Sequence, residues 1–405
     1  MVAICSAQPL VIKTAMQIAR DRSQPLLLEV TANQVNQFGG YTGMTPLQFS
    51  TFARQMASQV GLKADQMIIG ADHLGPWVWK EQTAHTAMTN AEELLRQCIH
   101  AGFQKIHLDT TYGCADDGSS HLPIELNAQR SVQLCRIAES MTYQKGPLYV
   151  IGSDVPQPGG GLLSDSASMV TGVDRMLMEL KIFKAAFRQL GLGTAWSRVI
   201  AMVVQPGVDF GDTAVSPYQP DQAVQLSAAY VQLPDHMTFE IHATDYQSPH
   251  ALQQMVRDHF MLLKVGPCIT FAMRRALYAL AGVESGLPNI DEPSNLQQVM
   301  EQLMLAHPDH WQCHYQGTAE QLRHLRHNSL RDRIRYYWLM PEARQAVERL
   351  MKNLQRSLPA SLLNQYLPEH VDEIGDQGLW NDPVGIVQLV IRHALTPYFE
   401  ACNPR

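Results

Sequence analysis

The chain lacks several features that would mark a membrane, secreted or phosphate-loop protein. No apolar run in its 405 residues approaches the roughly 20 residues that a membrane-spanning helix needs, so no membrane association is expected. The seven cysteines are irregularly spaced and include no CxxC pair, which indicates reduced thiols. The start of the sequence has no basic region or cleavage site of a signal peptide, so a cytoplasmic protein is expected. No GxxxxGK[ST] motif is present, which counts against kinases of that class.

The sequence also has no excess of basic residues over acidic ones. The 31 Lys and Arg residues are outnumbered by 38 Asp and Glu residues, giving a formal net charge of -7. A chain with this balance offers no general surface for nucleic acid, so no nucleic-acid partner is expected. Apolar residues make up 45% of the sequence, enough for one large core with an appended region.

Short apolar strands alternate with amphipathic helical segments through the first two thirds of the chain. The strand candidates are Val2–Ala7, Leu26–Thr31, Met67–Ala71, Lys105–Leu108, Leu148–Gly152, Val199–Val204, Thr238–Ile241 and Phe260–Val265. The helix candidates are Pro9–Arg20, Pro46–Val60, Ala84–Ala101, Glu125–Met141, Val173–Gly191, Gln219–Val231 and Ser248–His259. Eight such units within about 270 residues match the number and size of a TIM (β/α)8 barrel. The alternative, a doubly wound open sheet, usually has fewer strands and a glycine-rich first turn, which this chain lacks.

The last third of the chain has a different character. No convincing strand pattern follows Gly286, and the helical segments there are Asn295–Ala306, Thr318–Arg326, Pro341–Ser357 and Pro383–Glu400. We therefore expect an α/β protein in which residues 1–285 form a TIM barrel. Residues 286–405 are expected to form a helical extension that packs on it.

Polar side chains follow the predicted strands at the points where the strands end. In the stretch MIIGADHLGP, three apolar residues lead into Asp72 and His73, directly before a Gly-Pro pair. The other strand-end residues of this kind are Glu29, His107, Asp109, Asp154, Gln205, Glu240, His242, Asp245 and Lys264. The carboxyl ends of all barrel strands lie at one face, so we expect a binding or active site there.

Each of these residues also has a structural interpretation. A single strand-end histidine is more often a hydrogen-bonded structural residue than a ligand. Glu29 and Lys264 could form a buried ion pair between barrel layers, and Asp109 could cap a loop. The repetition of polar residues at the same face of nearly every strand favours a site over many independent structural roles.

Two histidines beside carboxylates suit a borderline divalent ion such as Zn²⁺ or Mn²⁺. We take His73 and His242 as candidate metal ligands, with Asp109, Asp154 or Gln205 to complete the shell. Asp72 is then a candidate proton donor or acceptor for a substrate hydroxyl. Such an arrangement suits aldol cleavage of a sugar. The further candidate catalytic residues are Asp109, Lys264 and Glu29.

A phosphate site is expected near the end of the eighth strand, where TIM barrels commonly bind phosphate at a helix N-terminus. Gly266 begins that segment and Arg274 follows one turn into the next helix. A second basic cluster, RDRIRYYW, supplies Arg333 and Arg335; its alternative is an ion-paired or solvated helix face. Gln37, in the loop after the second strand, is a further candidate for binding substrate.

Several long motifs in this sequence are specific. They are NQVNQFGGYTGMTP, ADHLGP, GFQKIHLD, YVIGSDVPQPGG, VVQPGVDF, HATDYQ, DHFMLLKVGP, DRIRYYW and NQYLP. Through them, almost the whole chain resembles the GatZ/KbaZ-type subunit of class II D-tagatose-1,6-bisphosphate aldolase. The resemblance implies a TIM barrel related to class II aldolases, with a role in galactitol or amino-sugar catabolism.

In that family the subunit is not catalytic by itself but supports a separate catalytic aldolase subunit. The resemblance therefore implies an oligomer containing that partner, and a phosphorylated ketose as ligand. Against catalytic class II aldolases, Asp72-His73 matches a catalytic Asp beside a metal-ligand His, and His242 falls where a ligand His is expected. Gln205 falls where another His would stand, which implies a weakened or repurposed metal site.

Two functions remain open on the sequence. The first is a partner subunit needed for the activity and stability of the catalytic subunit. The second, also implied by relatives, is a metal-dependent D-tagatose 6-phosphate 4-epimerase that works by retro-aldol and aldol steps.

Overall fold

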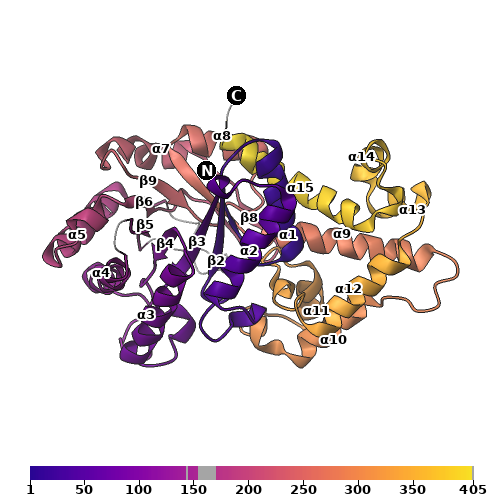
Figure 1. Ribbon diagram of the computed structural model, residues 1–405, viewed down its shortest axis with the longest axis horizontal. Helices are drawn as coiled ribbons and strands as arrows, with labels where there is room; N and C mark the ends of the chain where they lie inside the picture. The colour runs from indigo at the N-terminus through magenta and orange to yellow at the C-terminus, as the bar shows by residue number, and fades with distance from the viewer. Residues whose placement is uncertain (143–144, 154–169, 404–405) are drawn as a thin grey trace.

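Eight parallel strands close into a barrel in the computed structural model, which describes residues 1–142, 145–153 and 170–403 (Figure 1). Around the barrel the order is β1, β10, β9, β6, β5, β4, β3, β2. Their bounds are Val2–Cys5 (β1), Leu26–Thr31 (β2), Met67–Leu74 (β3), Lys105–Leu108 (β4), Leu148–Ile151 (β5), Val199–Val203 (β6), Thr238–Ile241 (β9) and Phe260–Val265 (β10). The predicted TIM barrel is confirmed, and each expected strand is present. A short antiparallel hairpin, β7 (Asp209–Phe210) with β8 (Val215–Ser216), was not foreseen.

Helices follow the strands as the periodicity predicted. Their bounds are Pro9–Asp21 (α1), Pro46–Val60 (α2), Ala84–His100 (α3), Ile124–Ser140 (α4), Val173–Gln189 (α5), Gly193–Trp196 (α6), Pro220–Ala228 (α7), Pro249–Arg257 (α8) and Pro267–Gly286 (α9). The start of α2 shows how local sequence fixes a helix end. The Thr45 hydroxyl accepts from the Gln48 amide and the Gln48 side chain accepts from the Thr45 amide, with Pro46 at the first helical position.

The later part of the chain is helical. Its helices are Leu296–Ala306 (α10), Ala319–Asn328 (α11), Pro341–Asn353 (α12), Ala360–Tyr366 (α13), Val371–Asp376 (α14) and Pro383–Ala401 (α15). Helix α12 ends at Asn353, before the expected Ser357, and Leu354 and Leu358 beyond it are buried in the core. None of the described helices combines the length and apolarity needed to cross a membrane.

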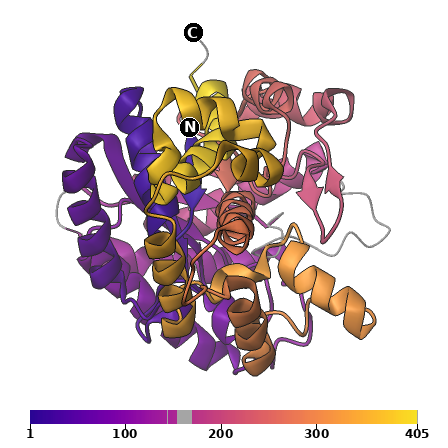
Figure 2. The ribbon, with the colours of Figure 1, turned by 90° about the vertical axis from the view of Figure 1, so that its right-hand side faces the viewer.

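Helix α15 returns from the extension to the barrel wall. It packs against α1, α8 and α9, so a C-terminal helix lies beside the N-terminal one (Figures 1 and 2). The Gln24 side chain donates to the Phe399 carbonyl at 3.3 Å, and Arg22 pairs with Glu400 at 2.9 Å. The wall of the barrel is therefore completed by a segment that is distant in sequence.

The barrel interior contains a layer of buried charge beneath the mouth. The Lys105 ammonium lies 2.7 Å from Glu29 Oε1 and 2.6 Å from Glu240 Oε2, and all three side chains are shielded from solvent. Gly70 leaves room for this layer, because a Cβ there would lie 2.8 Å from Glu29 Oε1. Lys264, on β10, adds a second ammonium group, with Nζ 3.8 Å from Glu29 Oε2.

Gly75, at the end of β3, permits a close approach to β4. A Cβ at this position would lie 1.6 Å from the carbonyl oxygen of Asp109. The same approach allows the Asp109 amide to donate to the Leu74 carbonyl at 3.0 Å. Glycine at this position therefore sets how β3 and β4 meet at the mouth.

We predict that Gly75→Ala lowers the free energy of unfolding by about 2–3 kcal/mol, because the added methyl group must push the β4 backbone away. Urea unfolding followed by circular dichroism measures the change. Gly193→Ala is the matched control, since nothing lies within 4 Å of its Cβ position; it should change stability by less than about 1 kcal/mol. Equal effects of the two substitutions would contradict the steric argument.

Candidate functional site

Strand β3 delivers two adjacent polar residues to the mouth by means of a bulge. It continues past the predicted end at Ala71, and its register with β4 shifts, so that Ala71 pairs with Ile106 but Leu74 pairs with Leu108. His73 has φ of +46°, a left-handed backbone that costs energy in a residue other than glycine. Its amide donates to Asp72 Oδ1 at 2.8 Å, which holds this conformation in place. In a regular strand, Asp72 and His73 would point to opposite faces.

Asp72 is held as a carboxylate by its neighbours. Its Oδ1 accepts from the His73 amide and the Lys264 ammonium and lies 3.0 Å from His107 Nδ1. Burial raises the pKa of Asp72, but His73, Lys264 and the bond with His107 outweigh burial and hold the pKa well below its ordinary value. The other oxygen, Oδ2, makes longer contacts, 3.5 Å to Cys5 Sγ and 3.6 Å to His73 Nε2. Oδ2 is therefore the oxygen left for a substrate.

Three buried histidines surround this carboxylate. The ring centroids of His73, His107 and His242 lie 5.1–5.2 Å apart. Each ring has one nitrogen near a carboxylate: His73 near Asp109 at 2.8 Å, His107 near Asp72, and His242 near Glu240 at 3.0 Å. Burial, followed by the charge of Lys264, lowers the pKa of His242 to about 3, and burial lowers the pKa of His107. These two imidazoles are neutral at physiological pH.

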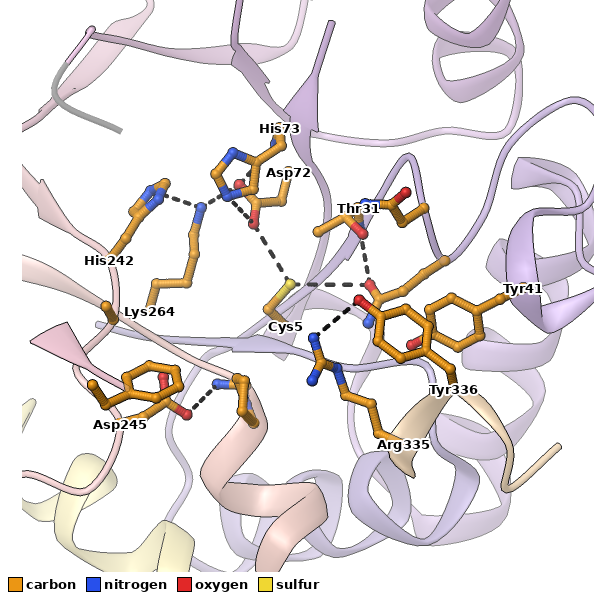
Figure 3. A pocket seen from close by; sticks show the side chains of 16 residues that line it. Cys5, Thr31, Tyr41, Asp72, His73, His242, Asp245, Lys264, Arg335 and Tyr336 are labelled. Carbon is orange, nitrogen blue, oxygen red and sulfur yellow. Dashed lines mark hydrogen bonds and ion pairs between the residues drawn. The ribbon is translucent and has the colours of Figure 1, made fainter. Parts of the chain in front are cut away.

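Lys264 projects from β10 into the centre of the site (Figure 3). Its Nζ lies 3.0 Å from Glu240 Oε1 and 2.9 Å from His242 Nε2, and it also donates to Asp72 Oδ1. Burial lowers the pKa of Lys264, but the carboxylates of Asp72, Glu240 and Glu29 outweigh burial and raise it well above its ordinary value. Lys264 is therefore held as an ammonium.

A pocket opens above this cluster at the carboxyl ends of the strands (Figure 3). The predicted site residues that line it are Asp72, His73, His242, Lys264, Gly266 and Arg335. Asp245, one of the strand-end residues expected at this face, also lines it, as do residues that sequence reasoning did not select: Cys5, Thr31, Gln34, Tyr41 and Tyr336. Burial, followed by the charge of Asp72, raises the pKa of the Cys5 thiol, so it stays neutral.

Other predicted residues lie away from the pocket. The Asp109 carboxylate lies beside the His73 ring and bonds to His73 Nδ1. Burial raises the pKa of Asp109, but the bond with His73 outweighs burial and lowers it. Glu29 lies in the charged layer below the pocket. The Gln205 side chain accepts from the Gly207 and Val208 amides, so it closes its own turn rather than facing the cluster. Asp154 lies outside the described residues.

Three residues predicted to bind phosphate or substrate make structural contacts. Arg274 donates to Asp332 at 2.7 Å and to the His327 carbonyl, which fastens α9 to the extension. Arg333 donates to the His310 carbonyl and lies over the Tyr336 ring. The Gln37 side chain donates to the Asn90 carbonyl at 3.0 Å. None of the three lines the pocket.

The expected phosphate position at the start of α9 is already engaged by the protein itself. Asp245 Oδ1 accepts from the Gly266 amide at 3.1 Å and from the Cys268 amide at 2.8 Å. Burial raises the pKa of Asp245, while these two amide bonds act in the opposite direction. An anion that binds in the pocket must therefore use other donors.

Arg335 is such a donor. It belongs to the turn η6 (Arg333–Tyr336) of the extension and reaches over the barrel mouth. Its guanidinium donates to the carbonyls of Arg331 and Asp332 and to the Tyr336 hydroxyl at 3.1 Å, and pairs with no carboxylate among the described residues. Burial raises the pKa of Tyr336, but Arg335, Arg333 and Arg331 outweigh burial and lower it. This wall of the pocket is strongly electropositive.

A group of potential metal ligands lies at the pocket floor. Among the described residues, Asp72, His107, Glu240 and His242 each offer a ligand atom within 4.8 Å of the others. In addition, His107 Nε2 and His242 Nδ1 are buried without a hydrogen-bond partner. The donor types suit Zn²⁺ or Mn²⁺. However, the Lys264 ammonium contacts three members of the group, so a cation of the protein already lies between these ligands.

Comparison with known proteins places this chain among its relatives. A family model described as D-tagatose-1,6-bisphosphate aldolase subunit GatZ/KbaZ-like matches residues 1–403. The chain belongs to the GatZ/KbaZ-like family. A D-tagatose-1,6-bisphosphate aldolase subunit GatZ of Salmonella enteritidis is 42% identical over 405 residues, covering 99% of this chain and 95% of that protein. The GatZ of Klebsiella pneumoniae is also 42% identical, over 408 residues, with the same coverage.

A solved structure supports the relationship of this GatZ/KbaZ-like chain at the level of the fold. The crystal structure of a probable tagatose 6 phosphate kinase from Sinorhizobium meliloti 1021 superposes with a TM-score of 0.90 at 39% identity. The match covers 99% of this chain and 100% of that one. The barrel and its helical extension are therefore shared as one unit with that protein.

The arginine cluster gives a prediction of pH-dependent stability. Burial, followed by the charges of Arg333, Arg331 and Arg335, lowers the pKa of His314 to about 3, whereas an unfolded histidine has a pKa of about 6.5. Below about pH 6.5, His314 takes up a proton in the unfolded chain but not in the folded chain, which favours unfolding. The contribution of His314 to the free energy of unfolding is therefore fully present above about pH 6.5 and falls as the pH drops toward 3.

Between pH 7 and pH 5, the wild type should lose about 1 kcal/mol more stability than His314→Gln, a value reduced for the partial exposure of this ring. Urea unfolding at the two pH values measures the difference. Replacement of an exposed histidine, His250→Gln, should leave the wild-type pH dependence intact. A His314→Gln curve parallel to that of the wild type would contradict the prediction.

Proposed function

We propose that this chain is the GatZ-type subunit of a D-tagatose-1,6-bisphosphate aldolase and acts with a separate catalytic subunit. The observation that carries the proposal is the whole-chain relationship, 42% identity over 99% of the chain, to proteins that bear this name. The complex is a hetero-oligomer that works in the cytoplasm on a phosphorylated ketose. Its place is in galactitol or amino-sugar catabolism.

We predict that co-expression with the catalytic aldolase subunit yields a complex that purifies on a tag attached to either chain. Cleavage of tagatose 1,6-bisphosphate should be several-fold faster, or last several-fold longer at 37 °C, than with the catalytic subunit alone. An unrelated TIM barrel expressed in place of this chain serves as the control. Failure to co-purify, with no gain in rate or half-life, would refute the proposal.

The pocket suits a sugar phosphate because its two cationic side chains differ in availability. Lys264 is surrounded by carboxylates at the floor, whereas Arg335 has no acidic partner among the described residues and lies at the electropositive wall. A guanidinium in this state can bind a phosphate through paired, charge-assisted hydrogen bonds. The sugar would then extend from Arg335 toward Asp72 and the histidines.

We predict that Arg335→Met weakens the binding of tagatose 6-phosphate by about 10- to 100-fold, because one charge-assisted interaction of about 1.5–3 kcal/mol is lost. Isothermal titration calorimetry gives the dissociation constants. Arg275→Met is the matched control: it removes the same charge from an exposed arginine on α9 that pairs with Glu369 and does not line the pocket. If both variants bind like the wild type, the phosphate lies elsewhere.

A second candidate function, D-tagatose 6-phosphate 4-epimerase, is favoured by the ionised Asp72 at the pocket floor. C4 of a 2-ketose is not adjacent to the carbonyl, so proton abstraction alone cannot invert it. Asp72 Oδ2 would take the proton of the C4 hydroxyl as the C3–C4 bond breaks, leaving an aldehyde and an enediolate. The electron pair of that bond ends on the C2 oxygen, where the Lys264 ammonium opposes the negative charge. After the aldehyde rotates, the bond re-forms on the other face and the proton returns.

Asp72→Asn separates the two functions. If the chain is an epimerase, the purified wild type interconverts tagatose 6-phosphate and fructose 6-phosphate, and the variant loses at least about 100-fold in kcat. If the chain acts only as a supporting subunit, the wild type shows no turnover, and the variant still binds and stabilises the catalytic subunit. Circular dichroism on the same preparations verifies that the variant is folded.

A further inference from the structure

The group at the pocket floor offers four potential metal ligands, but the Lys264 ammonium already lies among them. Asp72 Oδ1, Glu240 Oε1 and His242 Nε2 all lie within hydrogen-bond distance of Lys264 Nζ. His107 Nδ1, on the remaining member of the group, lies 3.0 Å from the same Asp72 oxygen. An ion bound by this group would have to take the place of the ammonium.

The charge of the surroundings leads to the same conclusion. Three carboxylates, from Asp72, Glu240 and Glu29, lie within 4.0 Å of Lys264 Nζ. Lys105 adds a second ammonium between Glu29 and Glu240. The two ammonium groups thus balance all but one of the carboxylate charges. A divalent ion added beside Lys264 would place an excess of positive charge in a buried layer.

The side chain of Lys264 is held at the pocket floor by its contacts. It is almost wholly buried, and it enters the cluster from β10, whose neighbours in the barrel are β1 and β9. The charged layer lies directly below, and Cys5 lies above, 3.5 Å from the free oxygen of Asp72. The ammonium is therefore anchored by Asp72, Glu240 and His242.

We propose that Lys264 is the resident cation of this site, and that its ammonium occupies the position and supplies the positive charge that a divalent metal would otherwise provide. The wild-type chain should accordingly fold and bind its ligand without a metal at Asp72, His107, Glu240 and His242. Removal of the ammonium should leave a vacant four-ligand site of two carboxylates and two imidazoles, a set that binds Zn²⁺ or Co²⁺. This inference does not depend on the proposed function.

The first test uses the wild-type chain, purified from zinc-supplemented cells without a chelator or metal-affinity tag. Mass spectrometry of metals should find far less than one ion per chain. Neither EDTA nor added Zn²⁺ should shift the melting temperature, and Co²⁺ should give no visible d–d absorption band. One tightly held ion per chain, released together with a fall in melting temperature, would overturn the proposal.

The second test uses Lys264→Met, which keeps an unbranched apolar side chain as far as Cε but removes the ammonium. This variant should bind one Zn²⁺ per chain, gain at least about 5 °C in melting temperature with Zn²⁺, and give a tetrahedral Co²⁺ spectrum. Adding His242→Gln to Lys264→Met should abolish all three effects. A folded Lys264→Met that binds no metal would overturn the proposal.

Lys105→Met is the matched control. It removes an equally buried ammonium from the same charged layer but leaves Lys264 among the four ligands, so it should gain no zinc. Zinc uptake by both variants would mean that loss of positive charge alone creates a site, and would overturn the assignment to Lys264. If the lysine variants do not fold, the wild-type measurements still decide the question. All readouts are independent of aldolase or epimerase activity, so failure of the proposed function leaves them interpretable.

Discussion

The arrangement of the mouth depends on the layer of buried charge inside the barrel. Two ammonium groups, Lys105 and Lys264, join carboxylates carried by β2, β3 and β9. Removing one partner from a buried ion pair typically costs about 3–5 kcal/mol, because the remaining charge stays desolvated. The layer therefore fixes the relative positions of five strands more tightly than apolar contacts alone would. It also fixes the charge state of the residues that a ligand meets.

Strand order and the face of the site could be predicted from sequence because both follow from local patterns. Apolar runs and helical periodicity define the eight units, and strand ends in a barrel share one face. His107 is among the strand-end residues expected at this face. Its place in the ligand group follows from the same logic, because it lies two residues before Asp109 and two after Lys105, and alternate residues of a strand share a face. Whether these residues act in catalysis stays a prediction.

Other features depend on contacts between distant segments, which local patterns do not contain. Arg274 and Arg335 were both predicted to bind phosphate because each is an arginine in a basic segment. In the structure, Arg274 links α9 to the extension, whereas Arg335 lines the pocket. Gln205 follows a strand as expected, but two amides of its own turn bind its side chain. The bulge at His73 depends on the hydrogen bond from the His73 amide to Asp72 and on a register shift against β4. Neither feature can be predicted from the types of the residues involved.

The return of α15 to the barrel has a consequence for how the chain acquires its structure. Helix α1 is complete by Asp21, yet one of its main packing partners, α15, begins at Pro383. The N-terminal units therefore keep an apolar flank exposed until more than three hundred further residues have been made. Contacts of such long range slow folding and expose intermediates to aggregation. The cost of this topology therefore falls on the folding of the chain during synthesis rather than on the finished site.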